Sequence, residues 1–135
     1  TPSASSAASD VYKRQNPNSA LAHLYRGQLN EKLGELDTAI SDFKKAVKLK
    51  PRYAQAYAAH AYTQLRKPKP NEKKIQSLLN KAIRFDKTLA YPHYLLCNLV
   101  KERNKGVARR HCQSYLKLAP TGEYADMAKD LLRSL

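Results

Sequence analysis

Two histidines and two cysteines in the last third of the chain are the residues best suited to chemistry. His93 and Cys97 are four residues apart on a predicted helix, and His111 and Cys112 lie on the next one. Two imidazoles and two thiolates are a ligand set for zinc. Adjacent residues on a helix point in different directions, so His111 and Cys112 would not face one ion. We therefore predict no metal site; the cysteines are either small apolar core residues or a disulfide.

The chain lacks the sequence motifs of common enzyme sites. It has no Gly-x-Ser-x-Gly elbow, no glycine-rich phosphate loop and no His-Glu-x-x-His, and it holds four glycines in 135 residues. Packing accounts for every predicted helix, which leaves no residues for a preorganised active site. We predict that the protein is not an enzyme and uses no cofactor.

Basic residues dominate the charge of the chain. There are 25 Lys and Arg against 11 Asp and Glu, a net charge of +14, and thirteen basic residues lie between Lys44 and Lys87. Such clusters neutralise phosphates, which makes nucleic acid one candidate partner. Lys44, Lys45 and Lys48, however, lie opposite the apolar stripe of their helix, as on an ordinary solvated face. We favour a protein or peptide partner, which the charge suggests is acidic. No apolar run approaches the roughly 18 residues of a membrane span.

Amphipathic helices are indicated from Ala20 onward. A first run of large and apolar residues ends at Gly34, and a second run with i, i+3, i+4, i+7 spacing ends at Pro51. This pattern predicts a helix, a tight turn and a second helix. Ala54 stands thirty-four residues after Ala20, and Ala90 opens a third unit. Similarity at this period predicts stacked helical hairpins.

The first unit resembles the tetratricopeptide repeat. The residues that carry the resemblance are Gly27, Gly34, Ala39, Phe43, Ala46 and Pro51. Small side chains let the paired helices approach, so we expect Gly27 to face the alanines beside Phe43. The first helix departs from the family pattern, because His23, Arg26 and Asn30 stand where large apolar residues are usual.

Two further units and a last helix extend the resemblance. They are marked by Tyr57, Ala61, Ile75, Leu79 and Ala82, then by Leu96, Cys97, Val100, Ala108, Cys112, Tyr115 and Pro120. Pro68 and Pro70 belong in a loop, because proline inside a helix costs about 3 kcal/mol or more. After Pro120 we expect a capping helix with Thr121 as its N-cap and Tyr124 among its residues.

The fold that the resemblance implies is all-α: a superhelical array of three antiparallel helix hairpins plus a C-terminal capping helix. We place the domain at residues 18–134, with repeats at 20–53, 54–89 and 90–121 and the cap at 122–134. Residues 1–17 are assigned to a disordered or non-native tail. Its first fifteen resemble translated sequencing-adapter DNA, and an ordinary linker is the alternative. The first hairpin lacks a cap, so we expect a longer array.

The resemblance also implies a concave groove lined by the first helix of each hairpin. We assign partner binding to Gln28, Lys32, Tyr62, Arg66, Tyr91, Tyr94, Asn98 and Lys101. The implied function is a scaffold that binds a peptide or partner protein in this groove. Two alternatives stay open: a basic nucleic-acid-associated domain, and a structural or self-associating spacer. The tyrosines could instead pack between hairpins.

One subclass of the family grips the C-terminal carboxylate of a chaperone with Lys, Asn and Arg side chains. The matching positions here hold Leu24, Gln28, Tyr62, Tyr94 and Asn98. Since this clamp is absent, we do not expect co-chaperone function of that kind.

Overall fold

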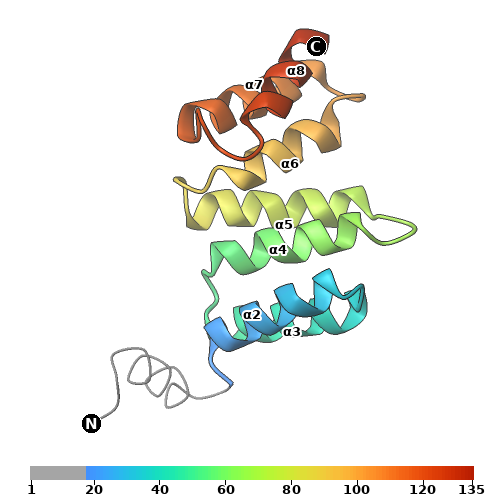
Figure 1. The fold of residues 1–135 in the computed structure, drawn as a ribbon, viewed down its shortest axis with the longest axis vertical. Coiled ribbons are helices and arrows are strands. Elements are labelled where there is room, and N and C mark those ends of the chain that lie inside the picture. Colours follow the sequence, from blue (N-terminus) through green and yellow to red (C-terminus); the bar gives the residue numbers. More distant parts are fainter. Residues whose placement is uncertain (1–17) are drawn as a thin grey trace.

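The computed structural model describes residues 18–135, which form seven α-helices (Figure 1). They are α2 (Ala20–Lys32), α3 (Leu36–Leu49), α4 (Ala54–Leu65), α5 (Glu72–Phe85), α6 (Tyr91–Val100), α7 (Lys105–Leu118) and α8 (Ala125–Ser134). The expectation for residues 1–17 lies outside the described residues. No helix between residues 18 and 135 has the length and apolar character of a membrane span.

Capping side chains, a glycine turn and a proline-containing loop mark several of the helix ends. Ser19 Oγ accepts from the backbone N–H of Ala22 at 3.1 Å and caps α2, and asparagines cap α5 and α7 in the same way. Gly34 has φ +84°, which turns the chain between α2 and α3. The loop between α4 and α5 holds Pro68 and Pro70, as predicted.

Consecutive helices pair as α2/α3, α4/α5 and α6/α7, and α8 packs on α7. Figure 1 shows the pairs stacked along the long axis of the molecule, with α8 at the end opposite α2. The predicted all-α array with a terminal helix is therefore confirmed. Its core is built on alanines with no exposed surface, such as Ala39, Ala46 and Ala61, which let the helices approach closely.

Gly27 of α2 lies against the ring of Phe43 of α3. A Cβ atom at Gly27 would lie 2.5 Å from Phe43 Cε1, and Phe43 is 1% exposed. The ring of Phe43 therefore fills the space that the missing side chain leaves.

Polar residues replace the usual apolar ones on α2, and a carboxylate on α3 lies within hydrogen-bonding distance of two of them. Asn30 Nδ2 donates to Asp42 Oδ2 at 3.1 Å, and His23 Nδ1 lies 3.2 Å from Asp42 Oδ1. His23 and Asp42 are both buried. A buried carboxylate requires such partners, so the departures at His23 and Asn30 form one buried polar cluster with Asp42.

The two cysteines form a disulfide that joins α6 to α7. The Cα atoms of Cys97 and Cys112 are 5.4 Å apart, and neither side chain is exposed. This decides between the alternatives that the sequence left open. Beside the disulfide, the Nδ1 atoms of His93 and His111 are 3.1 Å apart. Within residues 18–135, no three His, Cys, Asp or Glu side chains gather as a metal site requires.

Candidate functional site

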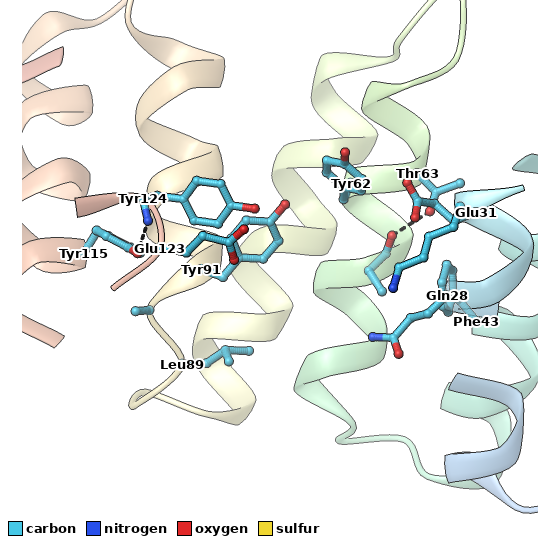
Figure 2. Close-up of a pocket in the computed structure, with 13 residues that line it drawn as sticks. Gln28, Glu31, Phe43, Tyr62, Thr63, Leu89, Tyr91, Tyr115, Glu123 and Tyr124 are labelled. Atoms are coloured by element: carbon cyan, nitrogen blue, oxygen red, sulfur yellow. Dashed lines mark hydrogen bonds between the residues drawn. The ribbon is translucent and has the colours of Figure 1, made fainter. Parts of the chain in front are cut away.

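A groove runs across the first helices of the three hairpins. It encloses about 780 Å³ and is closed at one end by the turn between α7 and α8 (Figure 2). We call it the groove cavity. Its lining residues are Gln28, Glu31, Lys32, Phe43, Ala59, Tyr62, Thr63, Leu89, Ala90, Tyr91, Tyr115, Glu123 and Tyr124. Because α2, α4 and α6 supply most of them, stacking of the hairpins creates the site.

Tyrosines from three segments cover one side of the groove cavity. The ring centroids of Tyr62 and Tyr91 are 6.3 Å apart, and Tyr91 stacks on Tyr124 at 5.2 Å. Tyr94 also stacks on Tyr124, with the two ring centroids 4.6 Å apart. We call Tyr62, Tyr91 and Tyr124 the tyrosine shelf; Tyr94 packs against it without lining the cavity. It offers flat aromatic surface with hydroxyl groups at its edge.

The turn before α8 is fixed by a buried hydroxyl. Tyr115 is 3% exposed, and its Oη accepts from the backbone N–H of Tyr124 at 2.9 Å. Gly122 allows this approach, since a Cβ atom there would lie 2.6 Å from Tyr115 Oη. Tyr124 therefore precedes α8 and faces the groove cavity, whereas the sequence placed it inside the capping helix. Thr121 lies in the same turn and is not the N-cap.

Burial affects two hydroxyls beside the groove cavity. It is the main cause that raises the pKa of Tyr91, with the nearby Tyr124 adding to the effect. Burial likewise raises the pKa of Tyr124. Both hydroxyls can donate and accept hydrogen bonds.

An ion pair at the rim ties the first hairpin to the second. Arg66 Nη1 lies 2.5 Å from both the backbone carbonyl and the carboxylate of Glu31. Arg66 follows α4 and Glu31 lies on α2, so the pair spans two first helices. Lys67 makes a second bridge to Asp37 at 2.8 Å. Both contacts bridge the first hairpin to the residues that follow α4.

Two charged side chains of the groove cavity are not in ion pairs within residues 18–135. Lys32 lies on α2, and Glu123 lies in the turn before α8. Figure 2 shows Gln28 and Glu31 on one side of the space, Tyr91 and Tyr124 on the other, and Tyr62 between them. Among the described residues, the groove cavity thus has an unpaired positive charge at Lys32 and an unpaired negative charge at Glu123, and the tyrosine shelf forms one of its sides.

The structure brings together some of the eight residues assigned from the sequence. Gln28, Lys32, Tyr62 and Tyr91 line the groove cavity. The others do not line it: Arg66 is held by Glu31 at the rim, Tyr94 stacks on Tyr124, and Lys101 Nζ lies 3.5 Å from Asn98 Oδ1 further along α6.

Sequence reasoning missed Glu123 and Tyr124 as groove residues. Both lie in the stretch Thr121–Gly122–Glu123–Tyr124, and a glycine two residues after Pro120 is a turn signal that argued against an immediate helix start. The hydrogen bond to Tyr115 had no counterpart in the sequence pattern.

This chain is similar in part of its sequence and in its fold to known proteins. Residues 20–53 match the family model of the tetratricopeptide repeat. No curated protein matches the sequence. A similar solved structure is the first TPR domain of Spaghetti (RPAP3) bound to the HSP90 peptide SRMEEVD, with a TM-score of 0.74 and 18% identity over 88% of this chain and 94% of that one. One matched repeat at residues 20–53 and the fold of stacked hairpins make this chain similar to tetratricopeptide repeat domains.

Proposed function

We propose that the protein is a non-enzymatic scaffold that binds a peptide segment of a partner protein in the groove cavity. The observation that carries this proposal is the tyrosine shelf beside a space of about 780 Å³. Sites that bind ligands are concave, mostly apolar and edged by a few polar groups, with volumes of about 300–1,000 Å³. The solved TPR domain of Spaghetti, which holds a peptide, supports the same kind of ligand.

The lining residues suggest the chemistry of the peptide. An aromatic or aliphatic side chain of the peptide would pack against the cavity side of Tyr62 and Tyr91, where rigid rings give contact area at little cost in conformational entropy. Gln28 would bond to the peptide backbone. Lys32 and Glu123 would each pair with an opposite charge, so the groove favours a peptide of mixed charge over a purely acidic one.

The peptide held by the Spaghetti domain differs from this ligand. A clamp for a terminal carboxylate needs basic and amide side chains, whereas Leu24 is 3% exposed and Tyr94 stacks on Tyr124. Neither side chain offers a charge to a carboxylate. The HSP90 peptide SRMEEVD is therefore the negative control for binding to this chain.

Peptides selected from a random twelve-residue library on the full chain would test the proposal. We expect binding that weakens about tenfold or more in Tyr62→Ala, because loss of a central aromatic costs about 2 kcal/mol. Tyr62 is 37% exposed, so helicity by circular dichroism should stay unchanged. Tyr25→Ala, at a tyrosine 52% exposed and outside the cavity, is the matched control. Equal binding by Tyr62→Ala and the parent chain, or tight binding of SRMEEVD, would overturn the assignment.

A further inference from the structure

The outer side of α5 carries a row of polar side chains with no apolar residue in it. Lys73, Ser77, Asn80 and Arg84 follow the spacing i, i+4, i+7, i+11 and so share one helix face. Together with Gln76 they line a shallow depression of about 350 Å³. The buried residues Ile75, Leu79 and Ala82 lie on the opposite face of α5, toward the core. The row therefore points away from the groove cavity.

Cations of α3 extend this row. Lys44, Lys45 and Lys48 are exposed on the side of α3 opposite the buried Phe43 and Ala46. Helices α3 and α5 both pack on α4. The charges of Lys44 on α3 and Lys74 on α5 also both lower the pKa of His60 on α4. The lysines of the two helices therefore lie on either side of α4. We call Lys44, Lys45, Lys48, Lys73, Lys74 and Arg84 the basic face.

The carboxylates of this region do not neutralise the basic face. Asp42 is buried with Asn30, Asp37 pairs with Lys67, and Glu72 pairs with Arg103. The fourth carboxylate, Asp86, accepts from Thr88. Within residues 18–135, none of the six cations of the basic face is in an ion pair. Its positive charge is therefore directed at solvent.

We propose that the basic face binds the phosphate backbone of double-stranded nucleic acid without sequence preference. Interfaces between proteins have an apolar centre and are poor in lysine, whereas interfaces with nucleic acid are polar and strongly positive. The row from Lys73 to Arg84 covers eleven residue-to-residue steps, or about 16 Å of helix. A duplex presents roughly nine phosphates over that length. Ser77, Asn80 and Gln76 add the hydroxyl and amide donors that contact phosphate and sugar oxygens.

A labelled duplex of random sequence, titrated with the full chain at increasing NaCl, tests this proposal by fluorescence anisotropy. We expect micromolar binding at 50 mM NaCl that falls steeply with salt. In Lys73→Gln/Arg84→Gln the slope of log K against log salt should decrease by about two, since each phosphate contact contributes about 0.9. Lys129→Gln/Arg133→Gln on α8, which removes the same charge elsewhere, should leave the slope unchanged.

Three results would overturn the proposal. One is the absence of duplex binding at 50 mM NaCl. Another is an equal loss in the α8 variant, which would show a response to net charge alone. The third is binding of poly-glutamate as tightly as the duplex, which would assign the basic face to an acidic protein. Circular dichroism of each variant separates these results from loss of fold.

Discussion

Close packing in the first hairpin depends on a residue without a side chain. Gly27 lies against the ring of Phe43, and an added Cβ atom would approach that ring to 2.5–2.9 Å. Phe43 is 1% exposed and packs with Ala39, Ala46 and other residues of the same core cluster. A larger residue at position 27 would therefore have to displace this ring.

Gly27→Ala should destabilise the protein by about 1–3 kcal/mol, the usual cost of overpacking a core. Gly106→Ala is the matched control, since the nearest atom to its added Cβ would be 3.6 Å away and alanine favours a helix by about 1 kcal/mol. Urea unfolding followed by circular dichroism measures both. Equal stability of the two variants would contradict the close contact.

His60 links the stability of the fold to pH. Burial, then the charges of Lys74 and Lys44, lower its pKa from 6.5 to about 4. Gln64 Nε2 lies 3.1 Å from His60 Nε2, and because an amide nitrogen donates, the ring nitrogen accepts. The folded chain thus holds a neutral imidazole.

As the pH falls, His60 of the unfolded chain takes up a proton before His60 of the folded chain does. The fold therefore keeps its full stability above pH 6.5 and loses stability as the pH falls toward 4. The free energy of unfolding should decrease by up to about 1.4 kcal/mol per pH unit in this window for one such group. Urea unfolding at pH 7, 6, 5 and 4.5 measures the slope. His60→Gln should reduce the slope and leave the part that comes from His111 and His93, whose pKa burial also lowers. An unchanged slope would contradict the lowered pKa of His60.

At the scale of elements, the disulfide joins the two helices of the third hairpin. Cys97 and Cys112 close a loop with a sequence separation of 15 residues between α6 and α7. Such a loop restricts the unfolded chain, which stabilises the fold by about 3 kcal/mol.

Unfolding in urea with a phosphine reductant should therefore occur at a lower midpoint than without it. Cys97→Ala/Cys112→Ala has no bond to reduce, so its midpoint should not respond to reductant. If the reductant also leaves the urea midpoint of the parent chain unchanged, the two thiols do not pair. Both cysteines are buried, so reduction should proceed only after unfolding.

The spacing of apolar residues predicts helices, whereas contacts between distant residues determine turns and cross-links that this spacing does not predict. The i, i+3, i+4 spacing around Ala39, Phe43 and Ala46 was enough to predict α3, because burial on one face of a helix imposes that spacing. The turn at Tyr124 depends on Tyr115, nine residues earlier, and the disulfide depends on how α6 and α7 align. Such details come from tertiary packing, which spacing along one helix does not encode.

The same limit applies to the candidate site. The family pattern predicted Gln28, Lys32, Tyr62 and Tyr91 near one groove, since equivalent positions of stacked helices face the same side. It did not predict that Glu31 would hold Arg66, because that pair joins different repeats. Pairing between repeats is set by the rotation from one hairpin to the next.

Across the whole molecule, charge is divided between two sides. The groove cavity holds Lys32 and Glu123, with Glu31 paired to Arg66 at its rim, so its charges balance. Much of the net +14 belongs instead to the outer helices, where the basic face lies. A count of charges cannot show this division, because it depends on which helix face is buried. The unpaired positive charge of the described residues is therefore concentrated on the outer side.

Two separated sites should bind their ligands independently. The groove cavity opens on the side of α2, α4 and α6, whereas the basic face lies on the outer side of α3 and α5, so neither ligand contacts the other. Saturation with duplex should then change the Kd of a selected peptide by less than about twofold, since a coupling free energy near zero leaves both affinities unchanged. Peptide anisotropy with and without duplex measures this at 50 mM NaCl. Displacement of the peptide by duplex would instead place both ligands in the groove, and Tyr62→Ala would then weaken both.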